Sequence, residues 1–399
     1  MSGLNIAALH EAIAEAVPDR DCIVWRERTL SWSVVTDRTR RFANGLLDRG
    51  VGGSPRAVDH GWESPHDHVA LLLTNGNEYL EAMLGCWKAR AASINCNYRY
   101  TAEELGHVLD DSAATAIVYH ARFAPVVADA IRSGSAIEHL VVVEDGSGVT
   151  PVDGSVGYED LLATASDDRP ALEWSGDDRY VVYTGGTTGL PKGVLWRQDD
   201  FLASALGITG SVDEAVERAR RPDRPRALPA PPFMHGAAHW NAISCWLSGG
   251  TVVIQSETDR LDPSDVLDTC ARERVGSMLI VGDAFARPLL DEQERRPRDL
   301  SNLRLLMTGG AILSPATKHR VSRVLPTVRI IDVLGSSETG RHGIEASGDQ
   351  SDDAASGFVP SASTVVLDET RTRELVPGED ADGWLAQRGR VPLGYLGDR

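Results

Sequence analysis

The sequence predicts an α/β protein with largely parallel sheets, and three observations support that fold class. Short apolar runs typical of strands alternate with segments whose apolar residues recur at helical spacing. Several of these runs end in glycine-bearing loops, as strands do at the ligand-binding edge of open parallel sheets. The length of 399 residues is more than one simple domain needs, so we expect two or more lobes.

The individual elements follow that alternation. His68–Leu73 is a predicted strand, and the next segment, 78–89, is a helix with four apolar residues on one face: Leu80, Met83, Leu84 and Trp87. Thr101 and Glu104 form a capping box that opens a helix toward Asp110. Further strands are expected over 115–119, 140–144, 179–183, 251–254, 277–281, 303–307 and 328–333, and helices over 263–273 and 315–324.

The remaining segments read as surface loops and a small β region. Residues 145–157 and 218–226 are predicted loops, and the second carries five arginines. We favour a solvated face for these arginines, and the alternative is a cationic rim that attracts a phosphorylated cosubstrate. From Gly357 onward, short strands over 363–367, 383–387 and 391–396 predict a small β subdomain.

Composition excludes several classes of protein. The net charge of −18 argues against nucleic acid or an anionic membrane as a partner. No apolar run approaches the ~20 residues that span a bilayer, and the N-terminus lacks the pattern of a signal peptide. The five cysteines are scattered and never form a CxxC pair. We therefore expect reduced thiols in a cytoplasmic protein, with no cysteine metal site. Cys86 and Cys96 each lie in an apolar run, so we expect these two to be buried core thiols.

The segment Tyr183–Gly193 has the composition of a phosphate-binding loop. It follows a predicted strand and combines glycines, threonine hydroxyls and the charge of Lys192. Glycine allows positive φ and close approach of backbone N–H groups to an anion. It is not a Walker A motif, because Gly193 stands where Ser or Thr should follow the lysine, and Pro191 argues against a helix starting there.

Four predicted strands run into glycine-rich loops, at residues 184–186, 282–283, 308–311 and 335–340. A single such loop could mean only that glycine terminates the strand. Because ligands bind outside the carboxyl ends of parallel strands, four such loops favour one shared cleft.

The last of these loops supplies candidate metal and nucleotide ligands. Glu338 in a Ser/Gly loop facing a triphosphate is a natural Mg²⁺ ligand, although taken alone it could be a solvated loop residue. Ser336 and Ser337 can donate hydrogen bonds to a phosphate. Asp332 could accept one from an exocyclic amine such as that of adenine.

A second constellation lies in Pro231–Trp240, where two prolines precede Phe233, His235 and His239. His235, next to Gly236, could gate or polarise a ligand tunnel, and we favour that function for it. For His239 we favour a satisfied core histidine, which is the more common role in an apolar segment.

With these motifs assembled, the chain resembles the adenylate-forming superfamily of acyl-CoA synthetases, luciferases and peptide-synthetase adenylation domains. The resemblance covers nearly the whole chain. Residues 183–193 are similar to the signature loop of that family, 308–311 to its adenine-side loop and 335–338 to its second motif. Residues 394–398 are similar to the segment near the end of its large N-terminal domain, and 95–100 are also similar. It implies two packed αβαβα subdomains with largely parallel sheets, over about 1–200 and 201–345, plus a small distorted β-barrel over 346–399.

The resemblance also implies roles for individual residues. Thr184 and Glu338 would bind Mg²⁺, and Glu338, Lys192 and His235 would act in catalysis. The ATP phosphates would be held by Thr184, Gly185, Gly186, Thr187, Thr188, Gly189 and Lys192. The rest of the nucleotide site would comprise Gly309, Gly310, Ala311, Asp332, Val333, Leu334, Gly335, Ser336 and Ser337. The acyl and pantetheine tunnel would be lined by His235, Gly236, Trp240, Gly282 and Gly310.

The chain departs from the family pattern at several points. Leu334 stands where the family has an aromatic residue that packs on adenine, and Ser337 replaces a threonine. The family's ribose-binding aspartate, hinge residue and catalytic lysine find no match before Arg399. We therefore expect a large N-terminal domain without its C-terminal lid domain, which binds ATP but adenylates slowly.

The function implied by the resemblance is activation of a carboxylic acid with ATP to an acyl adenylate, followed by transfer to CoA. The segment Phe233–Ala237 holds no carboxylate for an α-amine, which favours a plain acyl group over an amino acid. The residues of several motifs are similar to those of fatty-acyl and steroid side-chain CoA ligases. The sequence does not distinguish between these two substrate classes. The alternative function is a non-catalytic nucleotide- or acyl-binding module, and a homodimer is a candidate assembly.

Overall fold

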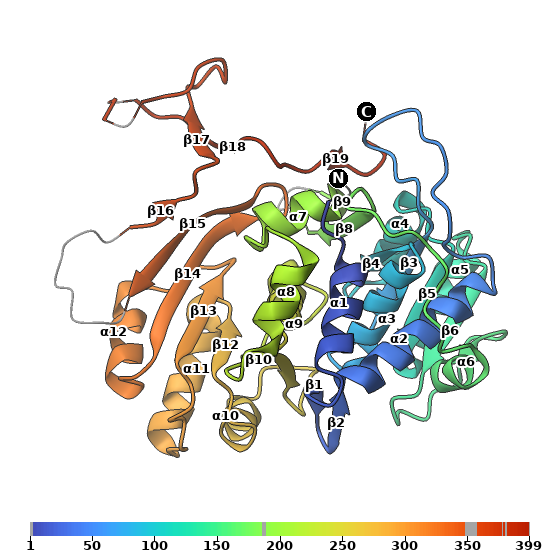
Figure 1. Ribbon diagram of the computed structural model, residues 1–399, viewed down its shortest axis with the longest axis horizontal. Helices are drawn as coiled ribbons and strands as arrows, with labels where there is room; N and C mark the ends of the chain where they lie inside the picture. The colour runs from blue at the N-terminus through green and yellow to red at the C-terminus, as the bar shows by residue number, and fades with distance from the viewer. Residues whose placement is uncertain (1–2, 186–188, 348–356, 377, 380, 399) are drawn as a thin grey trace.

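The structure is a computed structural model that describes residues 3–185, 189–347, 357–376, 378–379 and 381–398. Its strands form two large sheets and two small ones (Figure 1). Helices cover the outer faces of the two large sheets and fill the space between them. The predicted α/β architecture with largely parallel sheets is confirmed.

The larger sheet has nine strands in the order β16-β15-β14-β13-β12-β10-β11-β1-β2. It is parallel from β14 to β1 and antiparallel at both edges. Its strands are β1 Asp21–Trp25, β2 Arg28–Ser31, β10 Arg226–Pro229, β11 Thr251–Ile254, β12 Ser277–Ile280, β13 Leu305–Gly309, β14 Arg329–Ser336, β15 Gly340–Ser347 and β16 Val359–Pro360. Two strands from the N-terminal part of the chain thus complete a sheet built mainly from its second half.

The second large sheet is parallel throughout, in the order β4-β3-β5-β6-β7. Its strands are β3 His68–Leu72, β4 Ala92–Asn95, β5 Ala116–His120, β6 His139–Val143 and β7 Val156–Gly157. Both faces of β3 and β5 are buried, which explains why these strands read in the sequence as continuous apolar runs.

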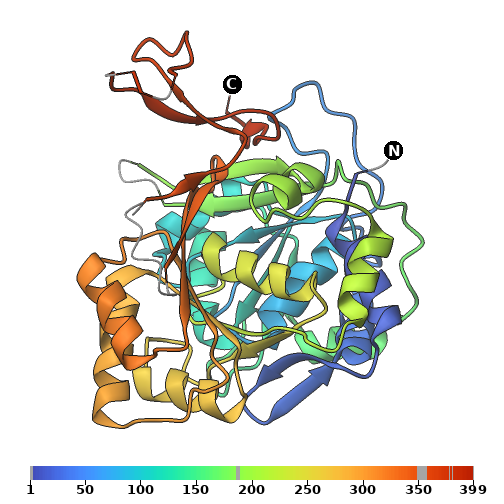
Figure 2. The same cartoon turned by 60° about the vertical axis from the view of Figure 1, so that its left-hand side comes forward.

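The helices form three layers that alternate with the two sheets. They are α1 Ile6–Ala16, α2 Trp32–Leu47, α3 Asn77–Lys88, α4 Ala102–Asp111, α5 Ala124–Arg132, α6 Tyr158–Thr164, α7 Gln198–Ser204, α8 Val212–Arg220, α9 Gly236–Trp246, α10 Pro263–Arg272, α11 Gly282–Arg295 and α12 Pro315–Val324, with a 3₁₀ turn at Ala121–Phe123. Apolar residues of α10, α11 and α12 pack on one face of the nine-stranded sheet, and α9 lies on the other face (Figure 2). Helices α4 and α5 cover the far face of the five-stranded sheet.

The helix α3 is buried along its whole length, because it lies in the central layer between the two sheets. The sequence predicted one apolar face for this helix, and the residues on its other faces are buried as well. The predicted capping box at the start of α4 is confirmed, since Thr101 and Glu104 cap each other's backbone N–H groups.

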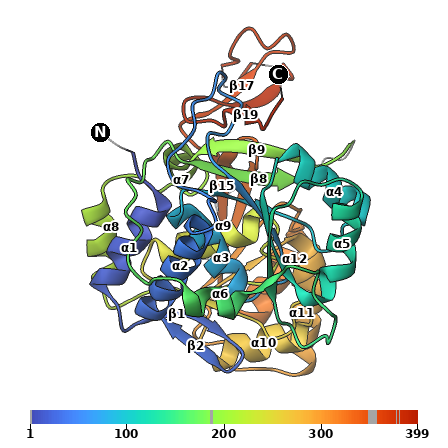
Figure 3. The same cartoon turned by 90° about the vertical axis from the view of Figure 1, so that its right-hand side faces the viewer.

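Two small antiparallel sheets lie beside the layers. The three-stranded sheet has the order β19-β9-β8, with β8 Arg179–Thr184, β9 Lys192–Arg197 and β19 Gly394–Tyr395. The two-stranded sheet pairs β17 Thr364–Leu367 with β18 Trp384–Gln387. Figure 3 shows β17 and β19 above β8 and β9. The described strands of 357–398 are thus divided among three sheets, and no closed barrel forms among them.

The predicted bounds of the loop 218–226 are wrong at both ends. Helix α8 continues to Arg220, and β10 begins at Arg226, so only 221–225 connects them. Arg226 is not a free cation, because its guanidinium pairs with Asp21 at 2.8 Å and with Glu273 at 3.1 Å. The ends of this basic segment therefore join elements of the core.

Two further sequence expectations concern the cysteines and membrane spans. All five cysteines are unpaired, as predicted, and all are buried, which was predicted for Cys86 and Cys96. Among the described residues, no helix combines the length and the apolar character that crossing a bilayer requires.

Candidate functional site

The predicted phosphate loop connects the two strands of an antiparallel hairpin. Strand β8 enters it, β9 leaves it, and Thr184 is paired with Lys192 at its base. A Cβ added at Gly185 or Gly189 would meet no neighbouring heavy atom within 4 Å, and neither glycine adopts positive φ. What glycine provides at these positions is therefore an unobstructed backbone. Gly186, Thr187 and Thr188 lie outside the described residues.

The loop's first threonine meets the predicted metal ligand. Glu338 lies at the tip of the β14–β15 hairpin, and its Oε1 accepts hydrogen bonds from Thr184 Oγ1 and Tyr395 Oη, each at 3.4 Å. Three segments that are far apart in the sequence therefore converge on one carboxylate. No Lys or Arg of the described residues pairs with Glu338, so its oxygens are open to another cation.

The hairpin tip that carries Glu338 is fixed by the three-stranded sheet. The indole Nε1 of Trp196 on β9 donates to the carbonyl oxygen of Ser337 at 3.0 Å. The hydroxyl oxygens of Ser336 and Thr339 lie 3.0 Å apart across the same tip. The Glu338 loop and the phosphate loop are thus tied to the same strand, β9.

Lys192 is close to this cluster but engages a different carboxylate. Its Nζ lies 2.9 Å from Asp398 Oδ2 and 5.1 Å from the centre of the Tyr395 ring. Hydrogen bonding to Asp398 raises the pKa of Lys192, whose side chain is more than half exposed. Tyr395 therefore lies between the ammonium of Lys192 and the carboxylate of Glu338.

Three of the four predicted glycine-rich strand ends are adjacent in the nine-stranded sheet. Strands β12, β13 and β14 are neighbouring parallel strands, and Gly282 N–H donates to Thr308 Oγ1 at 3.0 Å. Two features favour glycine at position 282: its φ is positive, at 54°, and a Cβ there would meet the backbone of Ala311 and Ile312. The fourth strand, β8, is not part of a parallel sheet, and it reaches the shared region only through Thr184 and Glu338.

Residues of β14 alternate between two environments. Asp332 is buried on the face that α11 and α12 cover, and its Oδ2 lies 2.8 Å from Nζ of Lys318. Val333 faces the opposite side and lines a cavity, whereas Leu334 is exposed. Val333 is therefore part of the candidate site, whereas the Asp332 carboxylate forms an ion pair with Lys318.

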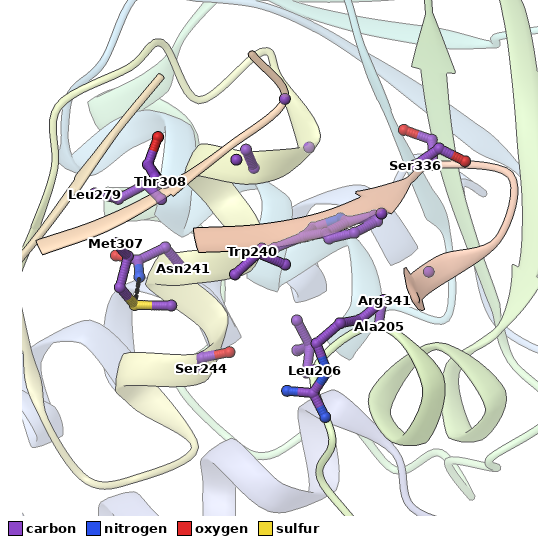
Figure 4. A pocket seen from close by; sticks show the side chains of 18 residues that line it. Ala205, Leu206, Trp240, Asn241, Ser244, Leu279, Met307, Thr308, Ser336 and Arg341 are labelled. Atoms are coloured by element: carbon purple, nitrogen blue, oxygen red, sulfur yellow. Dashed lines mark hydrogen bonds between the residues drawn. The ribbon is translucent and has the colours of Figure 1, made fainter. Parts of the chain in front are cut away.

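The cavity has a volume of about 250 Å³ and lies between the strand ends and α9 (Figure 4). On the strand-end side, its lining includes Gly309, Gly310, Gly335, Ser336 and Ser337. Helix α9 forms another wall, with Gly236, Ala237, Trp240, Asn241 and Ser244. The predicted tunnel residues Gly236, Trp240 and Gly310 are therefore wall residues, whereas Gly282 and His235 lie outside the lining.

The two histidines of the Pro231–Trp240 segment have different environments, and the prediction for His239 is confirmed. His239 is buried, with Nδ1 2.7 Å from the carbonyl oxygen of Phe233 and Nε2 against the Tyr180 hydroxyl. It is a satisfied core histidine, and burial lowers its pKa to about 4. His235 is the N-cap residue of α9 and is exposed, and partial desolvation together with Arg99 lowers its pKa.

Comparisons with known proteins agree with this arrangement. The family described as "AMP-binding enzyme" matches residues 10–396. The chain belongs to the AMP-binding enzyme family.

Relatives of this AMP-binding enzyme include two curated ligases. The chain is 41% identical to the medium-chain acyl-CoA ligase Mig of Mycobacterium avium, over 100% of this chain and 74% of the relative. It is 36% identical to a 3-oxocholest-4-en-26-oate–CoA ligase of Rhodococcus rhodochrous, over 99% of this chain and 71% of the relative. Among solved structures, the anthranilate CoA ligase AuaEII shares the fold with a TM-score of 0.82 at 20% identity, covering 100% of this chain and 72% of that one.

The donor set at Glu338 suits a magnesium ion. A carboxylate oxygen and a threonine hydroxyl are hard oxygen ligands, and Mg²⁺ commonly takes one or two carboxylates together with phosphate oxygens and water. Among the described residues, no three His, Cys, Asp or Glu side chains gather into a metal cluster. The AMP-binding enzyme therefore offers a partial ligand set that a nucleotide's phosphates would complete.

Several residues of this site carried no predicted role. Asn95, Trp196, Tyr395 and Asn241 contact or support it, yet none lies in a glycine-rich loop. A signal did exist for Asn95, because a polar residue that closes an apolar strand must find buried hydrogen-bond partners. For Tyr395 the signal was its place in a segment already similar to a family motif.

Proposed function

We propose that this AMP-binding enzyme activates a carboxylic acid with ATP and transfers the acyl group to CoA. In the first step a carboxylate oxygen attacks the α-phosphorus, which forms the acyl adenylate and releases pyrophosphate. In the second step the thiolate of CoA attacks the acyl carbon, and AMP leaves with the electron pair of the broken C–O bond. The convergence of Thr184 and Glu338 next to Ser337, which lines a mainly apolar cavity, is the observation that carries this proposal.

The phosphate loop would hold the triphosphate. The open backbone around Gly185 and Gly189 leaves N–H groups free for phosphate oxygens, and Lys192 adds a charge once it leaves Asp398. Thr184 and Glu338 would hold Mg²⁺, which neutralises charge on the phosphates when bound. Preorganised donors of this kind stabilise charge that develops during phosphoryl transfer.

The cavity would take the acyl chain, and the glycine- and serine-bearing loops that line its strand-end side would take the nucleotide. Gly309, Gly310 and Ala311 would border the base, with Leu334 as an aliphatic contact. His235, at the start of α9, would stand where the acyl chain and CoA approach each other. We propose a fatty acid or a steroid side-chain acid as substrate, supported by the apolar cavity walls and by the two curated relatives.

The proposed location is the cytoplasm, where reduced thiols persist. Five unpaired, buried cysteines support it.

Glu338→Gln tests the metal and nucleotide site. Glutamine keeps the size of the side chain but loses the charge, so we expect Mg·ATP to bind at least tenfold more weakly by calorimetry, because charged ligands dominate Mg²⁺ sites. Glu345→Gln is a matched control on the neighbouring strand, since Glu345 pairs with Lys318 outside the cavity. Equal affinity in the Glu338→Gln variant and wild type would refute the role of Glu338.

Acid-dependent exchange of pyrophosphate into ATP separates the enzyme from a binding module. Exchange that depends on an added carboxylic acid shows that the acyl adenylate forms reversibly. Binding of ATP and acid with no exchange under any condition would instead favour the non-catalytic module.

A further inference from the structure

We infer that helix α4, which lies outside the candidate site, positions the phosphate loop for the nucleotide through two side chains, His107 and Asp111. This inference rests on the proposed function and adds two positioning residues to it. Neither residue belongs to a glycine-rich loop, and neither lines the cavity beside α9. Figure 3 shows α4 beside the β8–β9 hairpin that carries the loop.

Helix α4 contacts both ends of the phosphate loop. At the first end, Tyr183 Oη donates to Asp111 Oδ2 at 2.6 Å. At the other end, Nε2 of His107 lies 3.1 Å from the carbonyl oxygen of Pro191, which can only accept, so this nitrogen carries the hydrogen. His107 and Asp111 are four residues apart and therefore lie on the same face of α4, one turn from each other. A single helix thus sets the spacing between the two ends of the loop.

Gly193 makes the contact between Tyr183 and α4 possible. It lies directly opposite Tyr183 in the hairpin, and a Cβ at this position would lie 2.6 Å from the tyrosine ring. The ring therefore lies across the glycine, and any larger residue there would displace the ring and its hydroxyl. This contact gives a physical reason for glycine at the position where a Walker A motif has Ser or Thr.

The direction of Tyr183 also sets the direction of the loop's proposed ligand-binding side chains. Successive side chains of a strand point to opposite faces, and residues directly opposite each other in an antiparallel pair share a face. Tyr183 and its partner Gly193 share the face toward α4. Thr184 and its partner Lys192 therefore share the other face, where Thr184 Oγ1 donates to Glu338. The contact with α4 thus keeps Thr184 and Lys192 directed toward the nucleotide.

Helix α4 is itself firmly placed in the structure. Reciprocal capping between Thr101 and Glu104 closes its first turn. Its buried side chains belong to the core cluster on the far face of the five-stranded sheet, and they are Leu105, Val108 and Leu109. The two hydrogen bonds from this helix therefore join the ends of an open loop to the core.

The test compares Asp111→Ala and His107→Leu with wild type by calorimetric titration with Mg·ATP and, separately, with AMP. We expect each variant to bind Mg·ATP about fivefold more weakly, which equals about 1 kcal/mol and is typical of one lost hydrogen bond. AMP lacks the β- and γ-phosphates that the loop would hold, so its affinity should change by less than about twofold. A purely structural role would instead weaken the binding of both nucleotides together.

Conservative variants and a neighbouring carboxylate serve as controls. Asp111→Asn keeps an acceptor for the Tyr183 hydroxyl, and His107→Gln keeps an N–H donor for the Pro191 carbonyl, so both should restore most of the wild-type affinity. Asp110→Ala removes the same charge from the exposed residue next to Asp111 and should leave Mg·ATP binding unchanged. The Tm should fall by no more than about 2 °C in any variant, because each change removes one partly buried bond.

Three results would overturn the inference while leaving the proposed function intact. They are Mg·ATP binding by Asp111→Ala and His107→Leu that equals that of Asp110→Ala, an equal loss of affinity for Mg·ATP and AMP, or conservative variants that restore nothing. A wild-type protein that binds no Mg·ATP would refute the proposed function itself and the inference with it. That result is visible before any variant is compared.

Discussion

Asn95 lies where three segments of the candidate site meet, and we expect its replacement by leucine to weaken both the fold and nucleotide binding. The residue ends β4 and is buried. Its Oδ1 accepts from Tyr183 N–H at 2.8 Å, and its Nδ2 donates to the carbonyl oxygens of Tyr183 at 2.9 Å and Met234 at 2.7 Å. One side chain thus joins the five-stranded sheet to the strand that enters the phosphate loop and to the segment before His235.

The size of the effect follows from these three bonds. Leucine fills a similar volume, so the change leaves one N–H and two carbonyl groups without partners in a buried place. At about 1–1.5 kcal/mol for each lost bond, the free energy of unfolding should fall by about 3–5 kcal/mol. For a chain of 399 residues, that loss corresponds to a decrease in Tm of about 4–6 °C.

Thermal unfolding and calorimetric titration with Mg·ATP measure the two consequences. Asn97→Leu is the control, because Asn97 is nearby but only half-buried and accepts one local bond, from Arg99 N–H. We expect the control to change Tm by less than about 1 °C, since surface substitutions rarely exceed ±0.5 kcal/mol. If Asn95→Leu costs no more than Asn97→Leu, the three bonds do not support the site.

Two further predictions concern pH and Lys192. Burial lowers the pKa of His66, His120 and His239 to about 4 each. The unfolded chain therefore binds more protons than the native state between about pH 6.5 and 4, so the free energy of unfolding should fall as the pH is lowered through that window. A Tm that stays constant from pH 7 to 4.5 would contradict this. Asp398→Asn frees Lys192 from an exposed ion pair and should strengthen Mg·ATP binding roughly twofold at low salt, an effect that high salt removes; weaker binding by calorimetry would show that Asp398 supports the site instead.

Much of the fold was predictable because strands and helices with strong local signals kept their bounds. Thr251–Ile254 and Pro315–Val324 coincide with the predicted strand and helix, and β3 and β8 differ from prediction by one residue at one end. These are segments in which apolar runs or periodic patterns end at glycine, proline or a capping residue. Local chemistry alone fixes such boundaries.

Other features depend on contacts between segments that are distant in the sequence, so the local sequence gives weaker signals for them. Strand β19 was expected in a small β subdomain, but its partner is β9, and nothing local to 391–396 specifies that pairing. The carboxylate of Asp332 pairs with Lys318 because β14 turns that side chain toward α12. Strand alternation decides such a direction, and a one-residue change in register would reverse it.

The same reasoning explains why the phosphate loop can be both open and precisely placed. A Cβ added at Gly185 or Gly189 would meet no neighbouring heavy atom within 4 Å, so the backbone is unobstructed on that side at both described positions of the loop. Its placement comes instead from the hairpin strands, which Asn95 holds at β8 and which β19 extends at β9. An anion-binding loop needs free N–H groups, and side chains packed on it would occupy that space. Substitutions at Asn95 should therefore lower nucleotide affinity by displacing the loop as a whole, with every phosphate contact weakened together.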